Sequence, residues 1–268
     1  MPKVSIIMGV YNTPDEEMLS LAVNSIINQT YSNWEFIICD DGSTDNTWDI
    51  LCKLATQDSR IVLIKNEKNM GLAATLNNCI NVSNGEYIAR QDADDYSEVN
   101  RFEKQVEFLE SNLEYSIVGS RANVFDDKKI WSVRGKEGRV ENRDFLFGTP
   151  FLHPTVMMRK ADLVKCEGYK VSRETLRTED YDLFMRMYAA GMRGYNLSEC
   201  LFYYREDREA YNKRKYRYRI DEAIVRYKGF KTLKLMPIGL LYVLKPLIIG
   251  LIPATCMHYL KNKWNSQH

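Results

Sequence analysis

The chain has 268 residues, of which 45% are hydrophobic and 27% are charged, and its formal net charge is +1. This balance is typical of a folded globular protein and excludes a disordered chain. A net charge so close to zero gives no global field that would attract nucleic acid, so no nucleic-acid partner is expected. The length suits one large α/β domain with a tail, or two small domains.

The six cysteines form no CxxC pair and no zinc-finger spacing with a histidine. Several lie inside apolar runs, so we interpret them as buried thiols in a reducing, cytoplasmic compartment. The chain begins MPKVSIIM, which has neither a long apolar run nor a cleavage site, and no export is expected.

The first hundred residues alternate between predicted strands and predicted helices. Continuous apolar runs predict strands at Val4–Val10, Trp34–Asp40, Arg60–Lys65 and Glu86–Gln91. Helical spacing predicts one helix over 18–27, a second capped by Ser43 or Thr44, and a third that begins at Gly71. Strands that alternate with helices indicate a mostly parallel sheet, and continuously apolar strands indicate helices on both faces.

After residue 100 this alternation is weaker. Helices are predicted over 102–109 and Thr178–Gly191, and strands over Ser116–Phe125 and His153–Lys160. Residues 126–145 are charged and poor in apolar side chains, which predicts a loop or a mobile flap.

Ligands of such sheets bind beyond the carboxyl ends of the strands. Asp92 and Asp94 stand two residues apart at one such end, in the motif QDADD. Two carboxylates at this spacing can chelate Mg²⁺ or Mn²⁺, whose other ligands would be water and a substrate diphosphate. An ordinary acidic turn is the alternative interpretation, and Asp95 remains as a spare carboxylate.

Two further carboxylate motifs are candidates for chemistry. Asp41, at the tip of the second strand, could accept a hydrogen bond from a nucleobase N–H, or it could belong to an Asx turn before a helix cap. Glu179 and Asp180 begin a helix, whose dipole stabilises the ionised carboxylate that a general base requires. Simple charge complementarity at a helix start is the alternative. His153 is interpreted as a structural histidine or as part of an acceptor pocket.

Several well-known nucleotide and hydrolase motifs are absent from the sequence. There is no GxGxxG after the first strand, no GxxxxGK[ST] and no GxSxG. These absences disfavour a dinucleotide-binding Rossmann enzyme, a P-loop NTPase and a serine hydrolase. Side-chain carboxylates with a metal ion offer another way to bind a nucleotide.

The order of five motifs resembles the family 2 inverting glycosyltransferases, which have the GT-A fold. The motifs are SIIMGVYN, QTYSNWEFIICDDGSTDNT, NMGLAATLNNCI, GEYIARQDADD and TEDYDLFMRM. Within that family, the whole chain is similar to the exopolysaccharide-synthesis enzymes of the EpsE type. The resemblance implies a GT-A catalytic domain over 1–205, with a nucleotide-binding half (1–100) and an acceptor-binding half (101–205), followed by a helical tail over 206–268.

The resemblance also implies a role for each matching position. Tyr11 would pack on the base, Asp41 would hydrogen-bond the uracil edge, Asp92 would contact the ribose or the metal shell, Asp94 would ligate the metal, Asp180 would be the catalytic base, and Glu179 would lie near the acceptor. These roles imply metal-dependent, inverting transfer from a UDP-sugar to a polyprenyl-diphosphate-linked or other saccharide. A metal-dependent nucleotidyltransferase is the alternative enzyme.

The tail is basic and aromatic at first and then apolar. Between Arg205 and Lys234 there are 11 Lys and Arg residues against 5 Asp and Glu. The apolar stretch Leu235–Leu260 is long enough to span a bilayer, but three prolines divide it into short pieces. This pattern predicts an in-plane anchor on the inner face of the cell membrane. The alternatives are a helical pair packed on the catalytic domain and a protein-interaction surface.

Overall fold

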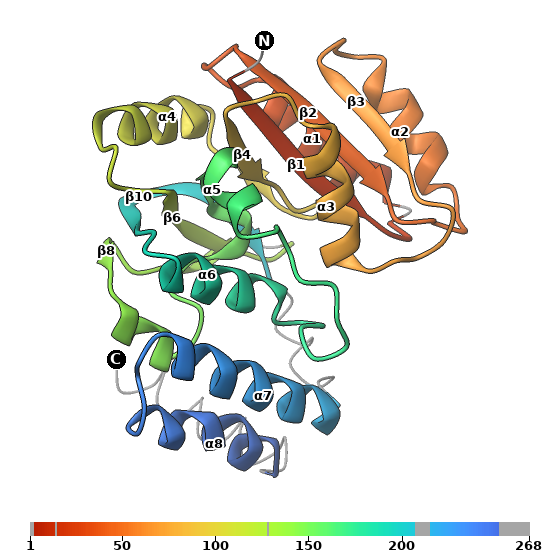
Figure 1. The fold of residues 1–268 in the computed structure, drawn as a ribbon. Helices are drawn as coiled ribbons and strands as arrows, with labels where there is room; N and C mark the ends of the chain where they lie inside the picture. Colours follow the sequence, from red (N-terminus) through yellow and green to blue (C-terminus); the bar gives the residue numbers. More distant parts are fainter. Residues whose placement is uncertain (1–2, 14, 128, 207–214, 252–268) are drawn as a thin grey trace.

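The computed structural model describes residues 3–13, 15–127, 129–206 and 215–251 (Figure 1). Residues 207–214 of the basic segment and 252–260 of the predicted anchor lie outside the described residues.

The first hundred residues fold as their apolar periodicity predicts. The elements are β1 (Val4–Val10), α1 (Glu16–Ile27), β2 (Trp34–Asp40), α2 (Thr47–Ala55), β3 (Ile61–Lys65), α3 (Leu72–Val82) and β4 (Tyr87–Arg90). Strand β1 runs parallel to β2 and β4, and β2 runs parallel to β3. The carboxyl ends of these four strands therefore lie at one edge of the sheet.

The second half extends the same sheet. Its elements are β5 (Tyr96–Ser97), α4 (Arg101–Ser111), β6 (Ile117–Phe125), β7 (Ile130–Arg134), β8 (Gly138–Val140), η1 (Asn142–Leu146), η2 (His153–Thr155), β9 (Met157–Arg159), α5 (Lys160–Lys165), α6 (Glu179–Ala189) and β10 (Gly194–Arg205). The strand order is β3-β2-β1-β4-β9-β6-β10-β5, with β7 paired to β6 and β8 to β10. Strand β9 is antiparallel to both neighbours, so β6 and β10 run parallel to β1.

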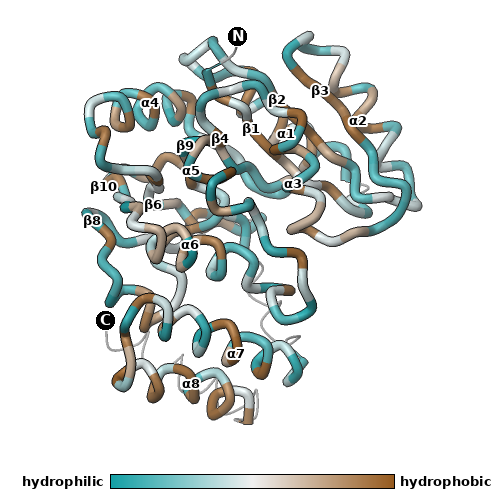
Figure 2. Tube along the Cα trace, in the orientation of Figure 1, coloured by the Kyte–Doolittle hydropathy of each residue, from teal (hydrophilic) through white to brown (hydrophobic). Residues whose placement is uncertain are grey.

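Helices cover both faces of the sheet, as predicted. Side chains of α1, α2 and α4 pack with Ile6 and Met8 on one face, whereas α3, α5 and α6 pack with Ile7 on the other. This division follows from the strand geometry, because successive side chains of β1 point to opposite faces. The result is a mixed α/β fold with a mostly parallel central sheet (Figures 1 and 2).

Three sequence predictions about local structure are wrong. Between residues 129 and 146 the chain forms β7, β8 and η1, so the predicted loop is wrong, whereas no observation tests the alternative of a mobile flap; the apolar pattern is weak because β7 is an edge strand with Ile130 and Val133 exposed. In His153–Lys160, the strand is confined to β9, since Pro154 has no N–H to donate. Helix α2 begins at Thr47 and is capped at Asn46, not at Ser43 or Thr44.

The described part of the tail contains two helices, α7 (Tyr216–Thr232) and α8 (Gly239–Leu251). Helix α7 lies against α6, where Met185 would collide with any side chain placed at Gly229. Phe230 and Val243 are buried in the same hydrophobic cluster as α6. The two tail helices therefore share the core of the preceding residues. Within the described residues, no helix is both long enough and apolar enough to cross a membrane.

Candidate active site

The loops after β1 and β2 are held together at the carboxyl edge of the sheet. The Asn12 N–H donates to Ser43 Oγ at 2.9 Å, and Asn12 Oδ1 accepts from the Thr44 N–H at 3.0 Å. Asn12 has a positive φ of 46°, which asparagine tolerates better than most residues. This arrangement leaves the neighbouring ring of Tyr11 45% exposed at the edge.

Asp41 is buried at the end of β2, with 4% of its surface exposed. Its Oδ1 accepts from Asn66 Nδ2 and from the Met70 N–H, both at 2.8 Å, and its Oδ2 accepts from the Gly71 N–H at 2.9 Å. The carboxylate thus fixes the loop between β3 and α3. Oδ2 accepts one bond from the protein, which leaves it capacity for a second donor.

Three aspartates gather after β4. Asp92 is half-buried and forms an ion pair with the fully buried Arg90. Asp94 is exposed at the loop. Asp95 is buried, its Oδ1 accepts from the Arg205 N–H at 2.7 Å, and its Oδ2 has no hydrogen-bond partner. The motif therefore lies against the end of β10 as well as at the end of β4.

Arg90 and Arg205 offset only part of the charge repulsion and desolvation of this acidic cluster. Although Asp94 is open to solvent, the protein around its carboxylate displaces much of the water, and this desolvation, followed by the charge of Asp92, raises its pKa. Burial and the two neighbouring aspartates raise the pKa of Asp95 well above its ordinary value. A bound cation would relieve the repulsion among these carboxylates.

The described residues do not form a complete metal cage. Among them, no group of three or more His, Cys, Asp or Glu side chains is arranged to hold a metal ion. Magnesium characteristically binds through one or two protein carboxylates plus substrate phosphates and water. Asp92 and Asp94 therefore fit a cation that arrives with a diphosphate.

Two buried arginines, Arg90 and Arg101, stabilise the acidic loop, and the sequence alone did not indicate them. Arg101 donates to the carbonyl of Arg90 at 2.9 Å and to Ser97 Oγ at 2.9 Å. Burial, followed by repulsion from Arg90, lowers the pKa of Arg101 to about 9. In the sequence, Arg90 stands at the end of a strand and Arg101 at the start of a helix, each next to apolar residues. Surface arginines commonly occur in the same pattern, so it does not indicate burial.

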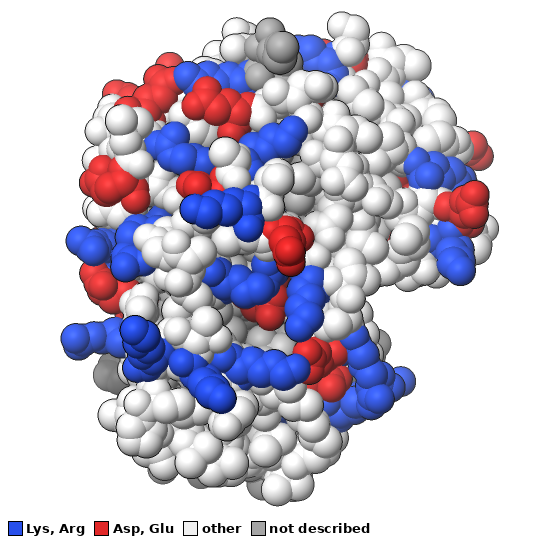
Figure 3. All heavy atoms as spheres, in the orientation of Figure 1, with Lys and Arg blue, Asp and Glu red and all other residues white. Residues whose placement is uncertain are grey.

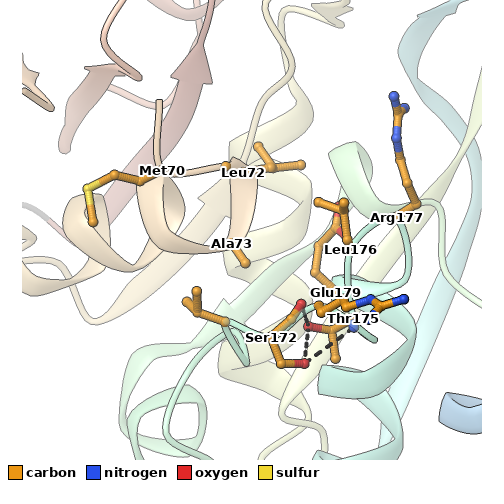
Figure 4. A pocket seen from close by; sticks show the side chains of 11 residues that line it. Met70, Leu72, Ala73, Ser172, Thr175, Leu176, Arg177 and Glu179 are labelled. Carbon is orange, nitrogen blue, oxygen red and sulfur yellow. Dashed lines mark hydrogen bonds between the residues drawn. The ribbon is translucent and has the colours of Figure 1, made fainter. Parts of the chain in front are cut away.

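A cavity of about 520 Å³ lies between the start of α3 and the segment that leads into α6 (Figure 4). Met70, Leu72 and Ala73 line one side of this cavity, and Leu176 and Glu179 line the other. Its first wall is the loop that Asp41 fixes. The cavity therefore lies between the first half of the chain and helix α6, which begins at Glu179.

Glu179 and Asp180 differ in their surroundings, as expected for adjacent helix positions about 100° apart. Glu179 lines the cavity, and desolvation by burial raises its pKa. Asp180 is half-buried, does not line this cavity, and accepts a hydrogen bond from the Tyr181 N–H at 2.8 Å. The structure thus brings Glu179 to the cavity and places Asp180 on the adjacent side of the helix start.

His153 is part of a buried link between the two halves. Its Nε2 lies 2.8 Å from the hydroxyl of Tyr169, whose backbone N–H and carbonyl both bond to the Asn77 side chain of α3. Burial, followed by the charge of Arg90, lowers the pKa of His153 well below its ordinary value. A half-buried histidine bonded to Tyr169 agrees with the structural interpretation of this residue.

Comparison with known proteins identifies the family. A family model described as glycosyl transferase family 2 matches residues 5–168. The chain belongs to glycosyltransferase family 2. This assignment favours the glycosyltransferase over the nucleotidyltransferase interpretation, and the matched residues include Asp41 and the three aspartates after β4.

Relatives of this glycosyltransferase cover most of its length. It is 45% identical to EpsE of Bacillus subtilis (strain 168), which is named as a glycosyltransferase, over 96% of this chain and 92% of that protein. It is 33% identical, over 76% of this chain and 78% of the relative, to WfaP of Escherichia coli, named a UDP-Glc:α-D-GlcNAc-diphosphoundecaprenol β-1,3-glucosyltransferase.

Solved structures of glycosyltransferases share the fold. Residues 1–349 of Staphylococcus aureus TarS, in complex with UDP-GlcNAc, match with a TM-score of 0.69 and 19% identity, over 84% of this chain and 66% of that one. The mannosyltransferase PcManGT of Pyrobaculum calidifontis, in complex with GDP-Man and Mn²⁺, matches with a TM-score of 0.64 and 17% identity, over 93% and 68%. At these identities the likeness shows the GT-A type of fold alone.

Proposed function

We propose that this family 2 enzyme transfers a sugar from a UDP-sugar to a lipid-linked saccharide during bacterial exopolysaccharide or capsule synthesis. The observation that supports it most is that the acidic loop after β4 lies at the same edge of the sheet as Asp41, whose hydrogen bonds fix one wall of the cavity that Glu179 lines. WfaP, a relative at 33% identity, is named for a UDP-sugar donor and a diphosphoundecaprenol acceptor.

The donor nucleotide would occupy the edge between the loops after β1 and β2. The exposed ring of Tyr11 would pack on the base, and Asp41 Oδ2 would accept the uracil N–H. Both groups are pre-positioned, because the Asn12 bonds hold the first loop and the three Asp41 bonds hold the second. Pre-positioning lowers the entropy lost when the ligand binds.

The leaving diphosphate would lie over the acidic loop. We assign Asp94 and Asp92 as the protein ligands of a Mg²⁺ or Mn²⁺ ion. When bound, this ion would supply charge neutralisation for the leaving UDP. Asp95 would hold the loop to β10 through the Arg205 N–H.

The catalytic base would come from the start of α6, on the far side of the sugar from the acidic loop. Asp180 would accept the proton of the attacking hydroxyl, and Glu179 would contact the acceptor in the cavity. A single displacement by that hydroxyl inverts the anomeric carbon, so an α-linked donor gives a β-linked product. No covalent sugar–enzyme intermediate forms.

The substitutions Asp180→Asn and Glu179→Gln distinguish the roles of the two carboxylates. We expect Asp180→Asn to leave UDP-sugar binding unchanged and to slow single-turnover transfer by about 10²–10⁴-fold, the usual effect of removing a positioned base. Glu179→Gln should raise the acceptor KM with a smaller change in kcat. If Asp180→Asn transfers at nearly the wild-type rate while Glu179→Gln abolishes transfer, Glu179 is the base.

We also propose that the enzyme acts in the cytoplasm, at the inner face of the cell membrane, through its tail. The outer side of α8 exposes Leu241, Ile248 and Leu251, and Lys245 lies on the same helix. An apolar helix face with nearby cations fits the interfacial zone of an anionic bilayer. A lipid-linked acceptor would be available at that surface.

A further inference from the structure

A second cavity, of about 430 Å³, opens between β7 and the segment that follows η1. Arg134, Lys136, Asp144 and Phe147 are among its lining residues. Among the described residues, none lines both this cavity and the one that contains Glu179. It is therefore a separate cavity, and the proposed binding site of the nucleotide-sugar donor does not include it.

The polar groups of this cavity suit a phosphate next to a sugar. Lys136 is 70% exposed at its side chain, and its Nζ lies 3.4 Å from Asp144 and 5.7 Å from the ring centroid of Phe147. Phe147 is 57% exposed. An ammonium group is a common phosphate ligand, and an exposed ring can cover the apolar face of a pyranose. Arg134 makes its ion pair with Glu206, whereas the solvent-exposed pair of Lys136 with Asp144 uses one ammonium N–H and leaves two for a phosphate.

The cavity adjoins the apolar side of the tail. The Phe147 ring contacts Tyr242 of α8 edge-to-face, with centroids 5.3 Å apart. On α8 and the residues before it, Ile238, Leu241, Ile248 and Leu251 are exposed. Figure 3 shows this uncharged surface at the bottom of the molecule, bordered by Lys and Arg side chains. A lipid chain along α8 would place its head group beside Phe147.

The cavity is also connected to the helix of the TED motif. Its wall continues from Phe147 through Phe151, whose ring packs on Phe184 of α6 with centroids 5.1 Å apart. Glu179 and Asp180 begin that same helix. These two buried rings fix the position of the cavity relative to α6.

We propose that this second cavity binds the diphosphate and the adjoining sugar of the lipid-linked acceptor, with Lys136 on the phosphate and Phe147 on the sugar. The inference rests on the proposed function for its choice of acceptor. The cavity presents the acceptor to the donor site, while the lipid lies along α8.

A binding experiment tests this site without turnover. The full chain, saturated with UDP and Mg²⁺ so that the donor site is filled, is titrated in detergent with geranylgeranyl diphosphate, geranylgeraniol or inorganic pyrophosphate. We expect the diphosphate lipid to bind more tightly than the other two. Lys136→Glu should weaken its binding by about tenfold, the scale of one lost charge contact, and Lys165→Glu on α5 is the matched surface control.

Each other outcome would overturn the proposal. If the alcohol binds as tightly as the diphosphate lipid, the site makes no phosphate contact. If pyrophosphate binds equally tightly, the cavity is a site for free phosphate. If Lys136→Glu binds the diphosphate lipid like the wild type, the head group lies elsewhere. UDP-sugar hydrolysis is measured on the same preparations and should be equal in wild type and the Lys165→Glu control. Absence of hydrolysis in the wild type would count against the proposed function, whereas the titration decides the acceptor site separately.

Discussion

Replacing Asp41 with alanine should weaken both the loop between β3 and α3 and, under the proposed function, the affinity for UDP. The side chain is 4% exposed and accepts three hydrogen bonds, of 2.8, 2.8 and 2.9 Å, from Asn66, Met70 and Gly71. The same carboxylate is assigned to the uracil N–H. One substitution therefore removes a support of the loop and a contact of the ligand.

The magnitude follows from these contacts. A hydrogen bond to a charged group contributes about 1.5–3 kcal/mol, and the three are not additive because they share one carboxylate. Met70 is exposed, so its N–H can regain water when the loop opens. We expect the free energy of unfolding to fall by about 2–4 kcal/mol. Loss of the uracil bond should weaken UDP binding by about 10- to 150-fold, which corresponds to 1.5–3 kcal/mol.

Urea denaturation and calorimetric titration with UDP measure the two effects. Asp49→Asn is the matched control, because Asp49 is an exposed aspartate in the first turn of α2. Asp41→Asn should fall between wild type and alanine, since an amide oxygen retains part of the acceptor capacity. If Asp41→Ala unfolds like the control and binds UDP like the wild type, the reasoning about this carboxylate is refuted.

Three other predictions use the same structure. Asp94→Asn, or chelation by EDTA, should lower transfer by about 100-fold through loss of the cation, and full turnover in EDTA would contradict the metal assignment. Burial raises the pKa of Asp95 in the folded protein, so at high pH the buried, ionised carboxylate lowers the free energy of unfolding. This loss of stability disappears as the pH falls toward the pKa of the unfolded chain, about 4. In EDTA, Asp95→Asn should therefore be more stable than wild type at pH 8, by about 1–3 kcal/mol, with no gain near pH 4 by urea unfolding. Leu241→Glu with Ile248→Glu should move the protein from anionic vesicles to the supernatant in a sedimentation assay without loss of UDP-sugar hydrolysis, since each exposed apolar side chain is worth about 1.5–3 kcal/mol when buried.

The sheet of the first hundred residues was predictable because its strands are buried on both faces. Runs such as Val4–Val10 and Trp34–Asp40 are apolar throughout, and polar residues mark where each strand ends. The position of Asp41 at the edge followed from the same pattern. Its three bonds to the chain did not, because their donors lie 25 to 30 residues away.

Strand β10 and the buried arginines could not be predicted in the same way. The polar pair Ser198 and Glu199 lies at the irregular register of β10 against β6, so the apolar alternation breaks in the middle of the strand. Arg101 is buried because carbonyl and hydroxyl groups from several elements surround it. Such an environment is a product of the tertiary fold and leaves no periodic signal.

The start of α6 shows a third limit. Sequence alone places Glu179 and Asp180 at a helix start and shows that they face different directions, but it does not determine which of them faces the cavity. The structure places Glu179 there. The role of Asp180 as base therefore stays a prediction.

The most direct test of the whole account is a transfer assay with a panel of donors. The full chain is incubated with Mn²⁺, a polyprenyl-diphosphate-linked saccharide and UDP-, GDP- or dTDP-sugars in turn, and the lipid product is measured. We predict sugar transfer from a UDP-sugar, with the linkage inverted relative to the donor, and transfer slowed by about 10²–10⁴-fold when Asp180→Asn replaces the wild type under the same conditions. Transfer that prefers GDP-sugars, or a product that retains the donor configuration, would contradict the proposed function.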